Sequence, residues 1–296
     1  MAPKNILILL LIAIAVVFHA FWYLTERRRH QPHGPLRPTA TALGAAFIAN
    51  FFDTLGIGSF ATTTSMSKLW GIMPDEKIPG TLNVGYVLAT VVQAVIFMTI
   101  IQVDFLTLIS IIGAAVLGAF LGAGVVCNFN RRQVQIGMGS ALLVASALMI
   151  LSMSGRGPAP GEALGLAGAK LGIAVGISMV LGALMMLGIG FYGPCMIMIS
   201  LLGMDPRVSY PIMMGACAFL MPSGSVQFVR KGSYHLRTAI AFLIAGPLAV
   251  LLAAPLVDRI PLFYLRILVL AVVLYTAIRM LYSAAQEKAA AANQIA

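Results

Sequence analysis

Two short segments of this chain combine glycines with polar side chains in a pattern that suits anion binding. In the first segment, Gly58 and Ser59 precede Thr62 within a run of hydroxyl residues. In the second, Gly190 precedes Tyr192. A helix that begins inside a membrane exposes backbone N–H groups, and these groups and the helix dipole attract negative charge. The structural alternative is that the glycines permit close helix packing and the hydroxyl groups bond to carbonyls of their own helix.

Other polar residues interrupt otherwise apolar stretches. Polar groups in lipid cost free energy, so these side chains are expected to face the protein interior or a wet cavity. Amide groups suit hydrogen bonding to an oxyanion. We therefore predict that Asn83 and Gln227 line the substrate site together with the residues of the two glycine segments, Gly58, Ser59, Thr62, Gly190 and Tyr192. Bonds between helices would explain them equally well. The remaining residues of this kind are Asn50, Gln93, Ser223 and Ser225.

Asp53 lies just before the first glycine segment, where an ionised carboxylate would repel an anionic substrate. Two roles are open for it. It could cap the half-helix that follows, which is the simpler account, or carry a proton and so couple transport to a proton gradient. Lys68 could snorkel to the surface or supply positive charge to the anion.

The chain is expected not to be an enzyme and to need no cofactor or metal. The catalytic patterns HExxH and GxSxG do not occur, and no two carboxylates share an apolar stretch. Cys127, Cys195 and Cys217 are isolated from one another and form no CxxC pair. Neither a disulfide framework nor a metal site is therefore expected.

Composition indicates a polytopic helical membrane protein. Hydrophobic residues make up 60% of the 296 residues and charged residues 9%, against about 25% charged in soluble domains. The net charge of +10 comes from short basic runs between apolar stretches, as membrane orientation requires. The expected partners are the lipid bilayer and a small anion, with a homodimer left open, and no nucleic acid.

A repeated segment indicates internal duplication. Leu55–Gly58 recurs as Leu187–Gly190, an offset of 187 − 55 = 132 residues, and the same offset relates Pro74 to Pro206. Shared glycines and prolines predict two copies of one membrane unit, the arrangement in which many transporters build a central substrate site.

Length predicts a break inside each copy. Positions 39–71 and 171–203 each form a mostly apolar segment of 33 residues. As one helix, such a segment would be about 50 Å long, against a hydrocarbon core of about 30 Å. Each segment is therefore expected to break at its glycines. Three plain spans should follow in each copy: Thr81–Ile101, Phe105–Val126 and Gln133–Met153, then Pro211–Val229, Leu236–Val257 and Pro261–Ser283.

The predicted fold is an all-α membrane protein with an extra N-terminal transmembrane helix and two inverted repeats, each a Gly-broken re-entrant hairpin plus three helices. Its parts are the N-terminal helix and basic linker (1–38), repeat 1 (39–153), a linker (154–170), repeat 2 (171–285) and a tail (286–296).

Orientation depends on whether the broken segments turn back. The chain is expected in the cell (inner) membrane. If the broken segments are hairpins, the N-terminus lies outside and the C-terminus lies in the cytoplasm. The basic loops then also lie in the cytoplasm: Arg27–Arg37, Arg131-Arg132 and Arg230–Arg237. Full crossings would place Arg131-Arg132 outside and make the copies parallel. The positive-inside rule favours hairpins.

The chain resembles the TauE/SafE family of sulfite and organosulfonate exporters over about Thr39 to Tyr282. Its order of motifs carries the resemblance: Gly56–Gly58, Gly80-Thr81, Val103-Asp104-Phe105, Gly113–Gly124 and Arg131-Arg132, then Gly188–Pro194, Arg230-Lys231-Gly232 and Ile260-Pro261 to Leu265-Arg266. The first break departs from the family pattern of adjacent glycines and a proline, because Ser59 and Phe60 follow Gly58.

The resemblance implies export of sulfite, sulfoacetate or a related organosulfonate by alternating access. Composition and spacing alone imply a transporter with an anion site. The alternatives are a permease or channel for another small solute, such as a carboxylate or a metal ion, and a membrane assembly factor or sensor that transports nothing.

Overall fold

The computed structural model describes residues 3–29, 36–56, 58–155, 161–188 and 190–256, and near the C-terminus residues 267, 270, 271, 273–275, 277, 278 and 280–286. Ile57 and Ile189, in the predicted breaks, lie outside these residues, as do 156–160 of the linker, much of the predicted span Pro261–Ser283 and residues 287–296 of the tail.

The described residues are helical apart from their connections and one isolated bridge between Ala163 and Met204, as expected of an all-α protein. The elements are α1 (Pro3–Arg28), α2 (Ala40–Thr54), α3 (Ser59–Trp70), η1 (Asp75–Lys77), α4 (Ile78–Gly85), α5 (Val87–Ile100), α6 (Phe105–Val126), α7 (Arg131–Met153), α8 (Gly168–Met186), α9 (Tyr192–Leu201), η2 (Pro206–Val208), α10 (Ser209–Lys231), α11 (Leu236–Ala253) and η3 (Ala254–Leu256).

Several helices can cross a membrane. In the described part of the chain, five helices are long and apolar enough: α1, α6, α8, α10 and α11 with η3. A sixth span would be formed by η1, α4 and α5 together, which bend by 42° at Tyr86. The prediction of a plain span over Thr81–Ile101 is therefore wrong in detail, because the helix begins before Thr81 and is interrupted at Tyr86.

Both long segments are divided between two helices, as their length requires. In the first segment, α2 ends at Thr54 and α3 begins at Ser59. In the second segment, α8 ends at Met186 and α9 begins at Tyr192. Gly56 and Gly188 occupy equivalent positions with φ of +90° and +103°. Glycine adopts this left-handed backbone without the steric cost that a side chain would add.

The duplication extends to backbone hydrogen bonds. Gly56 N–H donates to Asp53 O, and 132 residues later Gly188 N–H donates to Met185 O. At the other end of each half-helix, Ile72 N–H donates to Ser67 O, and Met204 N–H donates to Ile199 O. These local turns form twice because the glycine spacing recurs in the sequence.

The two copies interlock through reciprocal helix pairs. Helix α6 packs most extensively against α8, and its counterpart α11 packs against α2, the counterpart of α8. The α6–α8 contact depends on small residues. A Cβ added to Gly118 would overlap the carbonyl oxygen of Met179, and a Cβ added to Gly182 would overlap that of Ala115. Such close backbone approach is typical of helix pairs in membranes, where small residues permit it.

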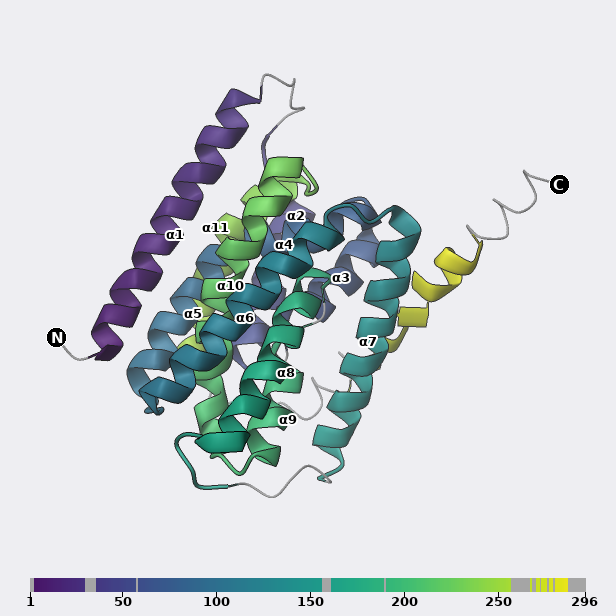
Figure 1. Cartoon of the computed structure of the whole chain (residues 1–296). Helices are drawn as coiled ribbons and strands as arrows, with labels where there is room; N and C mark the ends of the chain where they lie inside the picture. The colour runs from purple at the N-terminus through teal and green to yellow at the C-terminus, as the bar shows by residue number, and fades with distance from the viewer. Residues whose placement is uncertain are drawn as a thin grey trace.

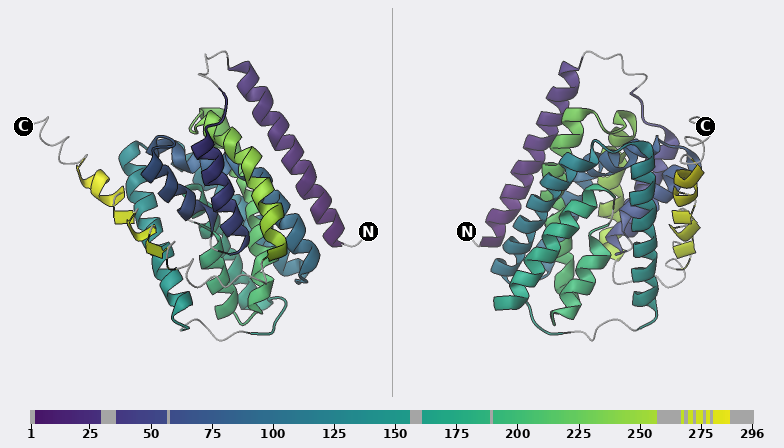
Figure 2. Two further views of the ribbon diagram at one scale, coloured as in Figure 1. Left: turned by 180° about the vertical axis from the view of Figure 1, so that it is seen from behind. Right: turned by 45° about the vertical axis from the view of Figure 1, so that its right-hand side comes forward.

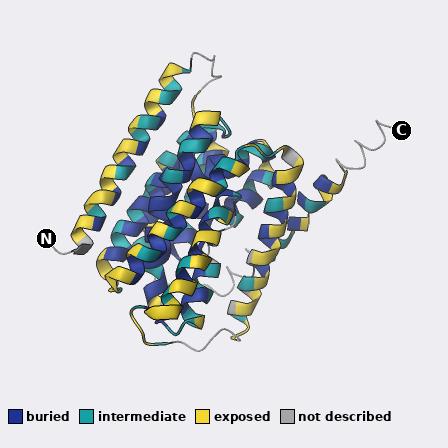
Figure 3. Ribbon diagram, in the orientation of Figure 1, coloured by how far each residue is buried: buried dark blue, intermediate teal, exposed yellow. Residues whose placement is uncertain are grey.

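Burial separates a central helix from lipid-facing ones. In the most apolar stretch of each helix, 83% of the α10 residues are buried, whereas 28% of the α1 residues are. Buried positions gather between the helices, and exposed positions lie on the outward faces (Figure 3). Helix α1 runs along one side of the bundle, opposite α7 and the C-terminal positions drawn in yellow (Figures 1 and 2).

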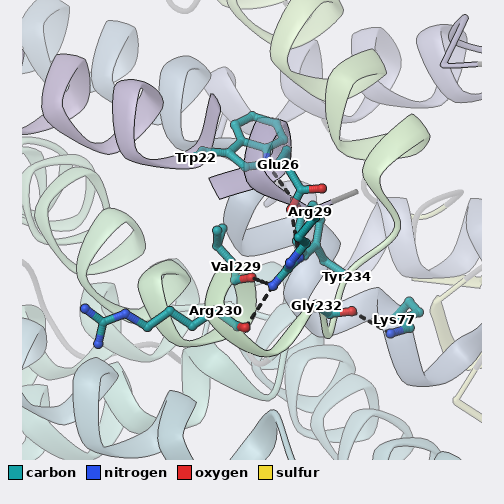
Figure 4. A network of polar contacts seen from close by, with 8 residues as sticks. All are labelled: Trp22, Glu26, Arg29, Lys77, Val229, Arg230, Gly232 and Tyr234. Atoms are coloured by element: carbon teal, nitrogen blue, oxygen red, sulfur yellow. Dashed lines mark hydrogen bonds and ion pairs between the residues drawn. The ribbon is translucent and has the colours of Figure 1, made fainter. Parts of the chain in front are cut away.

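Helix α1 has no counterpart in the second copy and is held by an aromatic and ionic cluster. The indole N–H of Trp22 donates to the Tyr234 hydroxyl at 2.8 Å, and that hydroxyl donates to Glu26 Oε1 at 2.6 Å (Figure 4). Glu26 also pairs with Arg29, at 2.7 Å. Arg29 in turn donates to the carbonyl oxygens of Val229 and Arg230, at the end of α10.

The turn between α10 and α11 (232–235) is the point where three parts of the chain meet. It bonds to α1 through Tyr234, and Lys77 at the start of α4 donates to the carbonyl oxygen of Gly232 at 2.7 Å (Figure 4). Ser233 donates to the carbonyl oxygen of Cys127 beyond α6, at 2.9 Å. We refer to this set of contacts around residues 232–235 as the clasp.

Candidate functional site

The start of α3 is held by a carboxylate from the preceding helix. Asp53 lies in the last turn of α2, and its Oδ1 accepts a 2.6 Å hydrogen bond from the backbone N–H of Ser59, the first residue of α3. The turn at Gly56 folds the chain back far enough for this contact. A carboxylate at a helix N-terminus is favoured by the unpaired N–H groups and by the helix dipole.

A second helix contributes the amide that continues this contact. Gln93 of α5 donates from Nε2 to Asp53 Oδ2 at 2.9 Å and to the Thr54 hydroxyl at 3.0 Å. Its Oε1 accepts a 3.1 Å hydrogen bond from the hydroxyl of Tyr192. Gln93 therefore joins the end of α2 in the first copy to the start of α9 in the second.

Tyr192 completes a connection between the two breaks. It is the first residue of α9, and its hydroxyl also approaches Met214 Sδ of α10 at 2.7 Å. Asp53, Gln93 and Tyr192 thus form one polar chain across the centre of the bundle, which we call the central triad.

Asp53 and Gln93 of the central triad are enclosed within the bundle, and Tyr192 is partly buried. Asp53 is 3% exposed and Gln93 is fully buried. Among the described residues no lysine, arginine or histidine forms an ion pair with Asp53. Ionisable groups buried at membrane depth without a charged partner are costly, and they commonly mark ion or proton pathways.

Open space adjoins the second glycine of each break. A Cβ added to Gly58 or to Gly190 would meet no heavy atom of the described residues within 4 Å, whereas one added to Gly56 or Gly188 would contact Tyr210 or Met138. The described structure therefore leaves room for at least a methyl-sized group beside each of these two glycines.

The starts of α3 and α9 differ in how they are capped. The N–H of Ser59 is bonded to Asp53, whereas among the described residues no side chain caps the start of α9. The first N–H of α9, that of Tyr192, is therefore not used by a capping side chain, while Pro194, two residues later, has no N–H to offer.

The other predicted lining residues lie in different settings. Thr62 donates to carbonyl oxygens of its own helix, Gly58 O at 3.0 Å and Ser59 O at 2.9 Å, which is the structural alternative considered for it. Asn83 donates to Pro79 O at 2.9 Å, while its buried Oδ1 has no partner among the described residues. No hydrogen bond found in the described part of the chain brings Gln227 to the central triad.

Gln93 was recognised in the sequence only as one polar residue among several. An amide within an apolar span signals burial against another polar group, but the sequence does not say which helix supplies that group. Its partners Asp53 and Tyr192 are 40 and 99 residues away. Only the packing of the two copies brings them together.

The two copies supply unequal chemistry to the centre. At the 132-residue offset, Asp53 is replaced by Met185 and Gln93 by Ser225, whose hydroxyl is buried without a partner among the described residues. The first copy therefore provides the carboxylate and the amide, and the second provides the Tyr192 phenol.

Lys68 is engaged away from the central triad. Its ammonium group lies 2.5 Å from Asp75 Oδ2, which also accepts a 2.9 Å hydrogen bond from Gln135 of α7. The described structure thus joins Lys68 to η1 and α7.

The comparison with known families agrees with this architecture. A family profile described as Sulfite exporter TauE/SafE matches residues 1–149 and 103–280. The chain belongs to the TauE/SafE family. No curated protein matches it. This TauE/SafE protein is therefore a multi-pass helical membrane protein of a family of sulfur-anion transporters, and the resemblance seen in its motifs is confirmed.

Proposed function

We propose that this TauE/SafE protein exports a small sulfur oxyanion, such as sulfite, sulfoacetate or a related organosulfonate, by alternating access between its two copies. The observation that carries the proposal is the central triad, because it joins the two helix breaks in the buried middle of the bundle. The family match supplies the substrate class.

The substrate is proposed to lie beside Gly58 and Gly190, with Ser59, Tyr192 and Asn83 as polar neighbours. Open space at both glycines and the uncapped start of α9 support this placement. Backbone N–H groups at a helix start and a phenol hydroxyl are donors, as an oxyanion requires. Thr62 and Gln227 are also proposed to line the site; the Thr62 hydroxyl bonds to the carbonyl oxygens of Gly58 and Ser59.

The broken segments are proposed to be re-entrant hairpins that enter from opposite sides. Contacts at their ends support this. Before α2, the carbonyl oxygen of Arg37 accepts from Arg237, and after α3, Lys77 donates to Gly232, so both ends of the first segment reach the α10–α11 region. In the second segment, Lys170 at the start of α8 donates to Leu202 O, just after α9.

This topology gives inverted repeats in the cell inner membrane, with the N-terminus outside and the C-terminus and basic loops in the cytoplasm. Arg29, Lys77, Arg230 and Lys231 gather around the clasp, at one end of the bundle, as the positive-inside rule requires of the cytoplasmic side. An inside-negative potential favours exit of each negative charge that no proton accompanies, by about 2.3 kcal/mol per charge per 100 mV.

A flux assay tests the proposal. Lipid vesicles containing the purified protein are loaded with sulfite, sulfoacetate or acetate, and release is compared with that from protein-free vesicles. We expect faster release of the sulfur anions and no acceleration for acetate. Equal acceleration of all three anions, or of none, would contradict the proposed substrate class.

A counterflow measurement separates a carrier from a channel. An alternating-access carrier exchanges substrate, so unlabelled sulfite outside the vesicles should speed the exit of labelled sulfite. A channel would show no such stimulation.

The oligomeric state is tested separately. Light scattering of the purified protein would decide between a monomer and a homodimer.

A further inference from the structure

The start of α3 is already occupied by a carboxylate of the protein itself, that of Asp53. The carboxylate of Asp53 accepts the Ser59 N–H bond at 2.6 Å, beside the open space at Gly58. A substrate anion that approached this helix start would compete with the carboxylate for the same N–H group. The two negative charges would also repel each other strongly in so enclosed a setting.

Protonation of Asp53 removes this conflict. Hydrogen bonds to an ionised acceptor are roughly twice as strong as those to a neutral one, so a protonated Asp53 is the weaker competitor for Ser59 N–H. In the described part of the chain, no cationic side chain forms an ion pair with the carboxylate. The titratable groups that face Asp53 are Tyr192 of α9, Tyr86 at the α4–α5 bend and Cys217 of α10, and side chains of these types are neutral near pH 7.

We propose that Asp53 is the proton-coupling residue of the transport cycle: it takes up one proton from water when the substrate anion binds, and it returns the proton to water when the anion leaves. This inference rests on the proposed function. The proton and the anion are bound together, and the Ser59 N–H passes from the carboxylate to the anion. The proton cancels one negative charge of the bound anion in the buried centre.

Gln93 extends the effect to the second copy. Its amide group donates to Asp53 and accepts from Tyr192, so a change in the charge of Asp53 alters the hydrogen bonding of Tyr192 at the start of α9. Gln93 is therefore a positioning residue, which links the protonation of the first break to the donor at the second.

The first experiment detects the proton without any substrate. Dicyclohexylcarbodiimide reacts with protonated carboxyl groups in apolar surroundings, and peptide mass spectrometry locates the product. We expect labelling of Asp53 in the full-length protein in bilayers, decreasing as the pH is raised through the neutral range. Labelling that does not change with pH, or no labelling of Asp53, overturns the proposal.

The second experiment measures proton uptake on binding. Calorimetric titration with sulfoacetate, whose own groups are ionised at neutral pH, is carried out in two buffers of different ionisation enthalpy. We expect about one proton taken up per anion bound, and an affinity that falls by up to about tenfold per pH unit as Asp53 ionises. The D53N variant should bind sulfoacetate with no proton uptake and with an affinity independent of pH.

Asp104 provides the matched control, because it is also a carboxylate that caps a helix. Its Oδ2 accepts from the N–H and the hydroxyl of Thr107, both at 2.8 Å, ahead of α6. The hydrogen bond from the Thr107 N–H, followed by that from its hydroxyl, holds the pKa of Asp104 below its usual range. D104N should therefore keep the proton uptake of the wild type.

The two experiments separate the two proposals. If no sulfur anion binds the wild type while Asp53 still titrates in the labelling experiment, the proposed substrate class fails and the proton site stands. If sulfoacetate binds without proton uptake, or D53N takes up the same number of protons as the wild type, the coupling role of Asp53 is refuted and the substrate class stands. Should D53N not fold, D53E, which keeps the carboxyl group, must retain pH-dependent labelling.

Discussion

At the scale of single residues, the centre of this protein depends on one amide. Gln93 uses both ends of its side chain: it donates to Asp53 and Thr54 and accepts from Tyr192. Because the two breaks belong to different copies, Gln93 is where the chemistry of one copy meets that of the other. Substitutions of its partners should therefore affect transport more than they affect folding.

Tyr192→Phe tests this connection. The change removes the hydroxyl that donates to Gln93 Oε1 and leaves that oxygen buried without its donor, at a cost of about 1–3 kcal/mol in the free energy of unfolding. We expect a folded protein with clearly slower sulfite release from vesicles. Tyr23→Phe is the control, since Tyr23 is 64% exposed on α1. An unchanged transport rate in Tyr192→Phe would show that the phenol is not needed.

Alanine substitutions at Gly58 and at Gly190 should have different effects on stability and on transport. Both have room for a Cβ, but Gly58 has a φ of +93°, which L-residues rarely adopt. Gly58→Ala should therefore lower the stability by about 1–3 kcal/mol through backbone strain. Gly190→Ala, which adds only a methyl group beside α9, should leave the melting temperature nearly unchanged and slow transport by obstructing the substrate. Normal transport by Gly190→Ala would place the substrate elsewhere.

At the scale of elements, the fold repeats one succession of helices and interlocks the two series. The pair α6–α8 and its counterpart α11–α2 each join one copy to the other, so neither copy has a complete packing surface of its own. Small residues make the first of these contacts possible, since Gly118 and Gly182 bring backbone against backbone.

Gly118→Val should separate α6 from α8. Its Cβ would overlap the carbonyl oxygen of Met179, which belongs to a helix backbone and cannot move without shifting α8. Overpacking of this kind costs about 1–3 kcal/mol, and we expect a lower melting temperature in detergent. Gly113→Val on the same helix is the control, because no heavy atom lies within 4 Å of its Cβ position. Equal melting temperatures for the two variants would contradict this packing.

At the scale of the whole molecule, α1 is attached to a duplicated core in which it has no counterpart. It packs along α10 and α5, and its C-terminal end joins the clasp through Trp22 and Glu26, followed by Arg29 just after the helix (Figure 4). The clasp also holds Lys77 from the first copy. Helix α1 therefore stabilises a point where the two copies meet.

Arg29→Ala should loosen this end of the molecule. The variant loses the ion pair with Glu26 and the donors to Val229 and Arg230, and hydrogen bonds to charged groups contribute about 1.5–3 kcal/mol each. We expect a lower melting temperature and faster proteolysis near α1. Arg27→Ala, at an exposed position of the same turn, should match the wild type. If both variants melt alike, the clasp does not hold α1.

The sequence by itself determined the class, the duplication and the positions of the helix breaks. These follow from local quantities: apolar content, a 132-residue offset and segments too long to cross a membrane as one helix. It also marked Asp53, Tyr192 and both open glycines as candidates. Local pattern did not reveal the interruption at Tyr86, where α4 and α5 bend.

Only the tertiary structure decided which polar residues meet. From the sequence, Gln227 was placed in the substrate lining and Gln93 was left out, although each is an amide in an apolar span. Packing of α5 between the two breaks brings Gln93 to Asp53 and Tyr192, and it leaves Gln227 outside that chain of contacts. The direction in which a helix presents a side chain depends on the helices around it. Those contacts join residues up to 99 positions apart, which no local pattern in the sequence encodes.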